Sequence, residues 1–237
     1  MSWILRQTDT TDPQSIANRM RNKRFRLFEQ LTESMPRPLR IIDIGGTLSF
    51  WEQRKWVNRD DIQITLVNLE AQPQRYSNIT PTVGDATNLH DVANYSFDIA
   101  FSNSVIEHLF TLENQTSMAR EMQRVASAYW LQTPNYWFPF EPHFQLPAWQ
   151  WMPIWLRVEI LRRRGAGRSG GPVRDPVLAR QFVSEVRLMT RSELVRMFPR
   201  AKVVPEKFAA LTKSWILYGG FPLRLGADPR LIMNGAR

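Results

Sequence analysis

The stretch FDIAFSNSVIEHL, residues 97–109, is the most informative part of the chain. Residues 97–102 are typical of a buried strand that ends at small polar side chains, and Glu107 and His108 follow at the start of a helix. Earlier, IIDIGG at 41–46 indicates a second buried strand, in which Asp43 comes just before a glycine turn. Such short apolar runs are typical of sheets covered on both faces. The sequence therefore predicts a buried parallel sheet with polar groups at the carboxyl ends of its strands.

Segments typical of strands and helices alternate through the first part of the chain. We expect strands at 39–44, 62–69, 82–84, 97–102 and 128–133, and helices at 13–34, around 50–58 and around 112–125. Asp12 and Pro13 would cap the opening helix, because proline is favoured at the first helical position. The alternation predicts an α/β fold with helices on both faces of the sheet.

The alternation stops at residue 134 and resumes near residue 190. Residues 134–172 are rich in proline and aromatic side chains and indicate an insertion that adds no sheet layer, with a mobile basic loop at 162–171. TRSE at 190–193 is a capping box, which predicts a helix to Phe198. Residues 202–208 and 214–218 are expected to form an antiparallel hairpin at the sheet edge.

These motifs, in this order, resemble the class I S-adenosylmethionine (SAM) dependent methyltransferases, in particular the small-molecule branch called methyltransferase type 11. The resemblance covers about residues 38–220 and implies a Rossmann-like, mostly parallel sheet of seven strands. It implies one domain over 1–237, made of a helix at 13–34, a SAM-binding half at 39–133, an acceptor-pocket or lid insertion at 134–172, and a C-terminal helix and hairpin at 186–220. The implied cofactor is SAM, which leaves as S-adenosylhomocysteine.

The resemblance also implies which residues bind the cofactor. They follow the ends of four strands: Asp43, Gly45 and Gly46; Asn68 and Glu70; Asp85 and Ala86; Ser102, Asn103 and Ser104. Between the two candidates for the ribose hydroxyls we favour Glu70 over Asn68. The glycine loop departs from the family pattern, because Thr47 and Ser49 stand at its later glycine positions. The same loop lacks the Gly-x-Gly-x-x-Gly spacing of nicotinamide enzymes, which argues against an oxidoreductase.

The insertion is the expected acceptor pocket, since insertions after the fifth strand commonly serve this purpose in the family. The substrate-binding residues that we expect are Tyr136, Trp137, Phe138, Glu141, His143 and Trp149. His143, and after it His108, are the candidate catalytic bases for a hydroxyl acceptor. Glu107, His108, Glu141 and His143 could together hold a divalent ion, but their spacing along the chain does not require one, and we expect no metal.

Composition limits the function further. The chain has no cysteine, which excludes disulfides, thiolate zinc sites and cysteine nucleophiles and fits a cytoplasmic protein. Charge is uneven: residues 1–150 carry 14 Lys/Arg and 16 Asp/Glu, a net −2, whereas residues 151–237 carry 17 and 6, a net +11. This asymmetry indicates an anionic partner, which could be a phosphorylated or carboxylated acceptor, the headgroups of a membrane, or nucleic acid. The aromatic side chains of the insertion indicate a flat or apolar acceptor.

We expect methyl transfer from SAM to a hydroxyl of a sugar, secondary metabolite or lipid-like acceptor. Two alternatives stay open. The first is a nucleic-acid or protein methyltransferase; against nucleic acid, the fourth strand ends in SNSV and not in the Asn/Asp-Pro-Pro-aromatic motif of many base methylases. The second is a non-catalytic protein of the same fold that binds a partner. The oligomeric state does not follow from the sequence.

Overall fold

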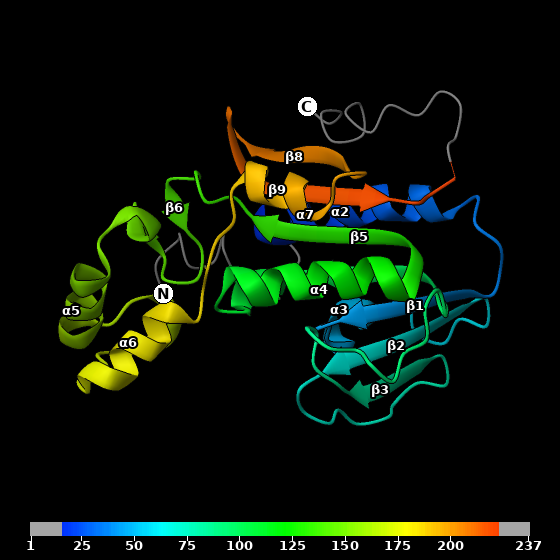
Figure 1. The fold of residues 1–237 in the computed structure, drawn as a ribbon, viewed down its shortest axis with the longest axis horizontal. Helices are drawn as coiled ribbons and strands as arrows, with labels where there is room; N and C mark the ends of the chain where they lie inside the picture. Colours follow the sequence, from blue (N-terminus) through cyan, green and yellow to red (C-terminus); the bar gives the residue numbers. More distant parts are fainter. Residues whose placement is uncertain (1–15, 223–237) are drawn as a thin grey trace.

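The computed structural model describes residues 16–222 and contains the predicted seven-stranded sheet (Figure 1). The strand order is β3-β2-β1-β4-β5-β9-β8, in which the first five strands are parallel and β9 and β8 are antiparallel. The strands are β1 (Leu39–Ile44), β2 (Ile62–Asn68), β3 (Ile79–Val83), β4 (Phe97–Asn103), β5 (Ala126–Pro134), β8 (Lys202–Phe208) and β9 (Leu211–Gly219). The prediction of fold class is confirmed.

Helices cover both faces of this sheet, as the apolar strands require. The helices are α2 (Ile16–Thr32), α3 (Leu48–Gln53), α4 (Leu112–Val125) and α7 (Arg191–Met197). In Figure 1, α4 lies in front of the sheet and α2 behind it. Each face has its own core: Phe28 of α2 and Trp51 of α3 belong to one cluster, and Met118 of α4 and Leu194 of α7 belong to the other.

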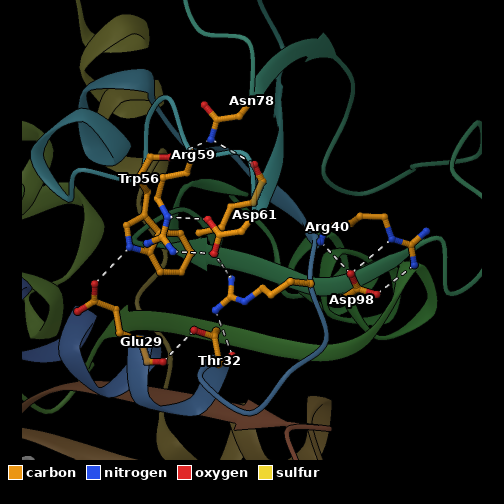
Figure 2. A network of polar contacts seen from close by, with 10 residues as sticks. Glu29, Thr32, Arg40, Trp56, Arg59, Asp61, Asn78 and Asp98 are labelled. Carbon is orange, nitrogen blue, oxygen red and sulfur yellow. Dashed lines mark hydrogen bonds and ion pairs between the residues drawn. The ribbon is translucent and has the colours of Figure 1, made fainter.

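Polar contacts fix the loops at the amino ends of the strands (Figure 2). Arg40 of β1 forms an ion pair with Asp98 of β4, with Nη2 and Oδ1 3.0 Å apart. The Asn78 side chain donates to the carbonyls of Trp56 and Ile62, which ties the loop before β3 to the loop before β2. These contacts lie at the end of the sheet opposite to the predicted cofactor site, so they stabilise the fold without taking part in binding.

The insertion after β5 forms a small cap with a core of its own. It contains β6 (Phe140–Glu141), β7 (Leu146–Pro147), the 3₁₀ turns η2 (Trp149–Trp151) and η3 (Gly167–Ser169), and α5 (Ile154–Arg164). Helix α6 (Pro176–Ser184), which the sequence analysis missed, packs against α5. The cap core consists of Phe144, Trp149, Leu161, Ala166, Ala179 and Val183. In Figure 1, β2 and β5 point toward the side of the molecule that carries the cap.

Several predicted boundaries are wrong. The helix expected around 50–58 corresponds to α3, at Leu48–Gln53. It ends before residue 58, because Lys55 and Asn58 adopt positive φ angles that do not fit a helix. The third strand begins at Ile79, which pairs with Ile64 of β2, and not at Thr82. The expected basic loop at 162–171 is structured in part: three of its four arginines form the last turn of α5, and the fourth, Arg168, lies in η3. The expected cap at Asp12 and Pro13 lies outside the described residues.

Within residues 16–222, none of the helices is long and apolar enough to cross a membrane.

Candidate functional site

The site begins where the order of the parallel strands reverses. In the sheet, β2 and β3 lie on one side of β1, whereas β4 and β5 lie on its other side. The strand order therefore reverses between β1 and β4. Ligands of open α/β sheets bind beyond the carboxyl ends of the strands at this point. The hydroxyl of Ser102 at the end of β4 donates to the carbonyl of Ile44 at the end of β1, at 3.1 Å. This fully buried contact fixes the two strand ends against each other.

Asp43 and Gly46 are packed directly against each other at the end of β1. A Cβ atom on Gly46 would lie 1.7 Å from Oδ2 of Asp43, so any side chain here would collide with the carboxylate. Asp43 is buried, its Oδ2 accepts from the indole of Trp51 at 2.8 Å, and its Oδ1 has no hydrogen-bond partner. Burial raises the pKa of Asp43 to about 7, although the Trp51 hydrogen bond opposes the rise. Glycine is therefore required at this position, because the loop backbone approaches the carboxylate too closely for any side chain.

The end of β2 contributes to the same loop through Asn68. Nδ2 of Asn68 donates to the carbonyl of Gly46 at 2.6 Å, and Nε2 of Gln72 donates to the same oxygen at 3.2 Å. Glu70, which we favoured for the ribose hydroxyls, is exposed just beyond this strand. Asn68 therefore supports the glycine loop, and Glu70 remains available for a ligand. Gln72 carried no signal in the sequence.

The third predicted segment forms a tight turn after β3. Oδ1 of Asp85 accepts from both the amide and the hydroxyl of Thr87, each at 2.8 Å, and Asp85 is exposed. The amide of Gly84 donates to the carbonyl of Asn68, which ties this turn to the end of β2. Ala86 is half-buried beside them. The predicted ribose and adenine residues thus follow neighbouring strands at one edge of the sheet.

Of the three residues predicted at the end of β4, two use their side chains within the protein. Ser102 donates to Ile44, as described, and the hydroxyl of Ser104 donates to Oε1 of Gln132 at 2.8 Å. Ser104 also adopts a φ angle of 58°, which a side chain rarely tolerates and which turns the chain sharply after β4. Asn103, half-buried between them, is the remaining side chain that could contact a ligand.

Beyond this turn, the structure brings the two candidate histidines together. The rings of His108 in η1 (Ile106–His108) and of His143 in the cap lie 4.8 Å apart, edge to face. Glu107 is fully buried beside them: its Oε2 accepts from Thr133 at 2.9 Å, and its Oε1 has no partner. Nδ1 of His143 lies 2.6 Å from Oε1 of Glu141. We call Glu107, His108, Glu141 and His143 the histidine cluster.

Burial and mutual charge shift the pKa values within the histidine cluster. Burial, together with the charges of His143 and Arg168, lowers the pKa of His108 to about 4. Burial also acts to lower the pKa of His143, but the hydrogen bond and charge of Glu141, together with Glu107, raise it overall. Burial raises the pKa of Glu107 to about 6. Opposed shifts in one cluster are typical of functional sites.

A cavity of about 360 Å³ lies next to the histidine cluster, between the cap and the segment before α7. Three predicted substrate residues line it, namely Tyr136, Glu141 and Trp149. Trp137 is 63% exposed, and Phe138 contacts the ring of Phe208. The sequence analysis missed the rest of the lining: Phe144, Gln150, Arg157, Val186, Arg187, Leu188, Thr190 and Glu193.

The cavity and the histidine cluster share walls. Glu141 belongs to both, and the backbone amide of Arg187 donates to the carbonyl of Glu107 at 2.8 Å. Arg187 is neutralised by Glu193, whereas Nε of Arg157 is buried in the cavity wall without a hydrogen-bond partner. A molecule in the cavity would therefore meet aromatic surface and a guanidinium group with the histidine cluster beside it.

Comparison with known proteins agrees with this geometry. Residues 53–128 match the family model described as a methyltransferase domain. Over these residues the chain is similar to the class I methyltransferases. The matched part spans β2 to β5 and includes Asn68, Asp85 and His108, and it implies SAM as the cofactor. The cap begins after the matched residues, so the family match leaves the acceptor open.

The curated relatives resemble the chain over a short stretch. The uncharacterized proteins Rv1509 and MT1557, from two strains of Mycobacterium tuberculosis, are each 31% identical over 90 residues. Those residues make up 38% of this chain but only 30% of each relative. The chain thus spans less than a third of the curated relatives that it matches.

Solved structures resemble the chain more widely but more distantly. A SAM-dependent methyltransferase from Aquifex aeolicus is 10% identical, with a TM-score of 0.47, over 82% of this chain and 87% of that one. The CurJ carbon methyltransferase is 11% identical, with a TM-score of 0.49, over 81% of this chain and 51% of that one. Nothing about a substrate of this chain follows from such distant similarity.

Proposed function

We propose that the protein transfers a methyl group from SAM to a hydroxyl of a small molecule bound in the cavity beside the histidine cluster. The observation that carries the proposal is the packing of Gly46 on the Asp43 carboxylate at the point where the strand order reverses. This packing requires glycine in the loop at the carboxyl end of β1, where a cofactor of this class would bind. Exposed Glu70 and Asp85 lie at the two neighbouring strand ends, where ribose and adenine would bind.

In such a reaction, the main roles of the protein are to align the acceptor with the methyl group and to activate it. When bound, SAM supplies a methyl group on a positively charged sulfur, which is already a good leaving group. The acceptor oxygen forms its bond to the methyl carbon as the carbon–sulfur bond breaks, and the electron pair of that bond stays on sulfur. Holding the acceptor oxygen in line with the carbon–sulfur bond lowers the activation free energy by several kcal/mol. The hydroxyl must also lose its proton, and we propose that the histidine cluster, whose Glu141 lines the cavity, promotes this loss.

The lining of the cavity favours a particular kind of acceptor. Tyr136 and Trp149 offer flat apolar surface, and Arg157 offers a positive charge with a buried nitrogen that lacks a partner. A cavity of about 360 Å³ is the size of a small-molecule site. We infer an acceptor with a flat or apolar part, such as a secondary metabolite, a sugar with an aglycone or a lipid-like molecule. An acidic group on it would pair with Arg157.

Calorimetric titration with S-adenosylhomocysteine tests the proposal without knowledge of the acceptor. We expect a dissociation constant of about 1–100 μM, equivalent to roughly 5–8 kcal/mol. Glu70→Ala and Asp85→Ala should each weaken binding at least tenfold, which is about 1.4 kcal/mol. Asp91→Ala is the matched control, since this acidic side chain is 88% exposed in the loop before β4. A folded protein that gives no heat at millimolar ligand would overturn the proposal.

A further inference from the structure

We propose that Glu107, His108 and His143 form a binding site for a divalent transition-metal ion of the zinc type. One potential ligand atom from each of these residues lies within 4.8 Å of those of the other two. In a tetrahedral zinc site with bonds of about 2.0–2.1 Å, the donor atoms lie roughly 3.3 Å apart. Small side-chain rotations therefore suffice to bring the three donors onto one ion. Two histidines and one carboxylate, with a position left for water or substrate, are a common ligand set of catalytic zinc.

The free atoms of the cluster are the ones that a metal ion needs. Oε1 of Glu107 is fully buried and has no hydrogen-bond partner, a costly arrangement for a carboxylate unless a cation binds there. Its other oxygen is held by the hydroxyl of Thr133, which fixes the orientation of the carboxyl group. A metal ion at Oε1 would satisfy this orphaned atom.

Glu141 prepares His143 for the same role. Because a carboxylate accepts, Nδ1 of His143 carries the proton shared with Oε1 of Glu141, and Nε2 is left with its lone pair. A carboxylate behind a histidine is the usual outer contact of metal-bound imidazole, since it fixes the ring and makes it a better ligand. The remaining oxygen of Glu141 accepts from the amide of Phe144 at 2.6 Å, so both of its oxygens have a partner within the cap.

The surroundings are compatible with a cation. Among the residues that the structure describes, Arg168 is close enough to lower the pKa of both histidines, and its charge is compensated by an ion pair with Glu185. With both imidazoles neutral, the three ligands carry one negative charge toward the ion. The lack of cysteine in the chain also removes thiolates as competing metal ligands.

The role of the ion rests on the proposed function. An acceptor hydroxyl bound at the open position would become far more acidic, because bound cations lower the pKa of the oxygen they hold. Its proton would pass to solvent, and the oxygen would then take the methyl group. His108 and His143 would in this case act as metal ligands and not as bases.

Metal binding can be measured directly on a tag-free protein that has been treated with a chelator. We expect Zn²⁺ to bind with one equivalent and a dissociation constant of about 1 μM or lower by calorimetry. Co²⁺ should give the visible absorption bands of a tetrahedral or five-coordinate ion. His108→Ala and His143→Ala should each weaken Zn²⁺ binding by more than about 100-fold, and Glu141→Gln by about 10–100-fold.

His90→Ala is the matched control, because the chain has three histidines and this one is exposed beside Asp91. It should leave Zn²⁺ binding unchanged. Zn²⁺ binding weaker than about 100 μM in the wild type, or equal losses in His90→Ala and His143→Ala, would overturn the proposal. Glu107→Gln changes a fully buried group, so the two half-buried histidines serve as the primary variants.

A parallel titration with S-adenosylhomocysteine separates this proposal from the proposed function. Cofactor binding without Zn²⁺ binding would overturn the metal site alone. Zn²⁺ binding without cofactor binding would support the metal site and overturn methyl transfer.

Discussion

Glu141 holds His143 by a contact of 2.6 Å between Oε1 and Nδ1, and its other oxygen holds the amide of Phe144 at the same distance. The carboxyl group is 1% exposed and lies at the start of the cap. One buried side chain therefore sets both the path of the cap backbone and the direction of the imidazole. The stability of the cap and the chemistry of the histidine cluster are coupled through this residue.

Glu141→Leu should destabilise the protein by about 2–4 kcal/mol. The leucine would leave the buried amide of Phe144 without an acceptor, which costs about 1–3 kcal/mol, and would remove the contact to His143 as well. Glu141→Gln keeps an acceptor oxygen and should lose less. Urea denaturation measures both, with Glu159→Gln as a control, because the pairs of Glu159 with Arg162 and Arg163 are largely exposed. Equal stability of wild type and Glu141→Leu would contradict this account of the cap.

Gly46→Ala should weaken binding of S-adenosylhomocysteine at least tenfold, about 1.4 kcal/mol. The added Cβ would lie 1.7 Å from Oδ2 of Asp43, so the glycine loop or the carboxylate must move. Gly171→Ala is the matched control, since a Cβ there meets nothing within 4 Å. Calorimetry gives the affinities, and circular dichroism confirms that both variants fold. If the two variants bind the ligand equally well, the loop is not part of the cofactor site.

The strands were predictable because their signal is local. The run from Phe97 to Ser102 is typical of a buried strand, and β4 covers it almost residue for residue. The capping box at Thr190 was equally readable, and both of its hydrogen bonds are present. Helix α6 was missed because its buried side chains, Ala179 and Val183, pack on the cap and not on the sheet. Sheet periodicity carries no information about such a satellite core.

The site was predictable only in part for a similar reason. Asp43, Gly46 and Asp85 lie at strand ends, and the order of the strands brings them to one edge. Arg157 and Arg187 line the cavity through tertiary packing of the cap, which no spacing along the chain reveals. The approach of His108 and His143, 35 positions apart, likewise depends on how the cap folds back.

The stability of the protein should depend on pH through Asp43. Its pKa is about 7 in the folded protein against an ordinary value of 3.8, so between pH 4 and 7 the folded state keeps a proton that the unfolded chain has released. The free energy of unfolding must therefore fall as pH rises through this window, by at most about 4 kcal/mol, and this fall ends above pH 7. Asp43→Asn should remove this part of the slope.

Urea denaturation at several pH values between 4.5 and 7.5 tests the dependence. Because the pKa of Glu107 is also raised, the quantity to compare is the difference between wild type and Asp43→Asn at each pH. Asp91→Asn, at an exposed position, should follow the wild type. Parallel curves for the wild type and Asp43→Asn would show that Asp43 is ionised in the folded protein throughout this range.

Glu206→Gln should cost about 3–5 kcal/mol of stability, because Glu206 is a buried carboxylate among several cations. Its Oε1 lies 3.1 Å from Nε of Arg24. Its charge also acts to raise the pKa values of Arg21 and Lys213, against the effect of their burial. Burial lowers the pKa of Arg21 to about 10, with the charges of Arg24 and Arg54 acting in the same direction. Without Glu206, these cations would repel one another in a poorly solvated region.

The double variant Arg24→Met/Glu206→Gln separates charge compensation from packing. Removing both partners of a buried ion pair costs much less than removing one, so the double variant should be more stable than Glu206→Gln alone. Asp98→Asn breaks the more exposed pair with Arg40 and should cost no more than about 1 kcal/mol. Urea denaturation of all three variants gives the comparison. A double variant less stable than Glu206→Gln would mean that Arg24 stabilises α2 by packing its side chain and not by pairing with Glu206.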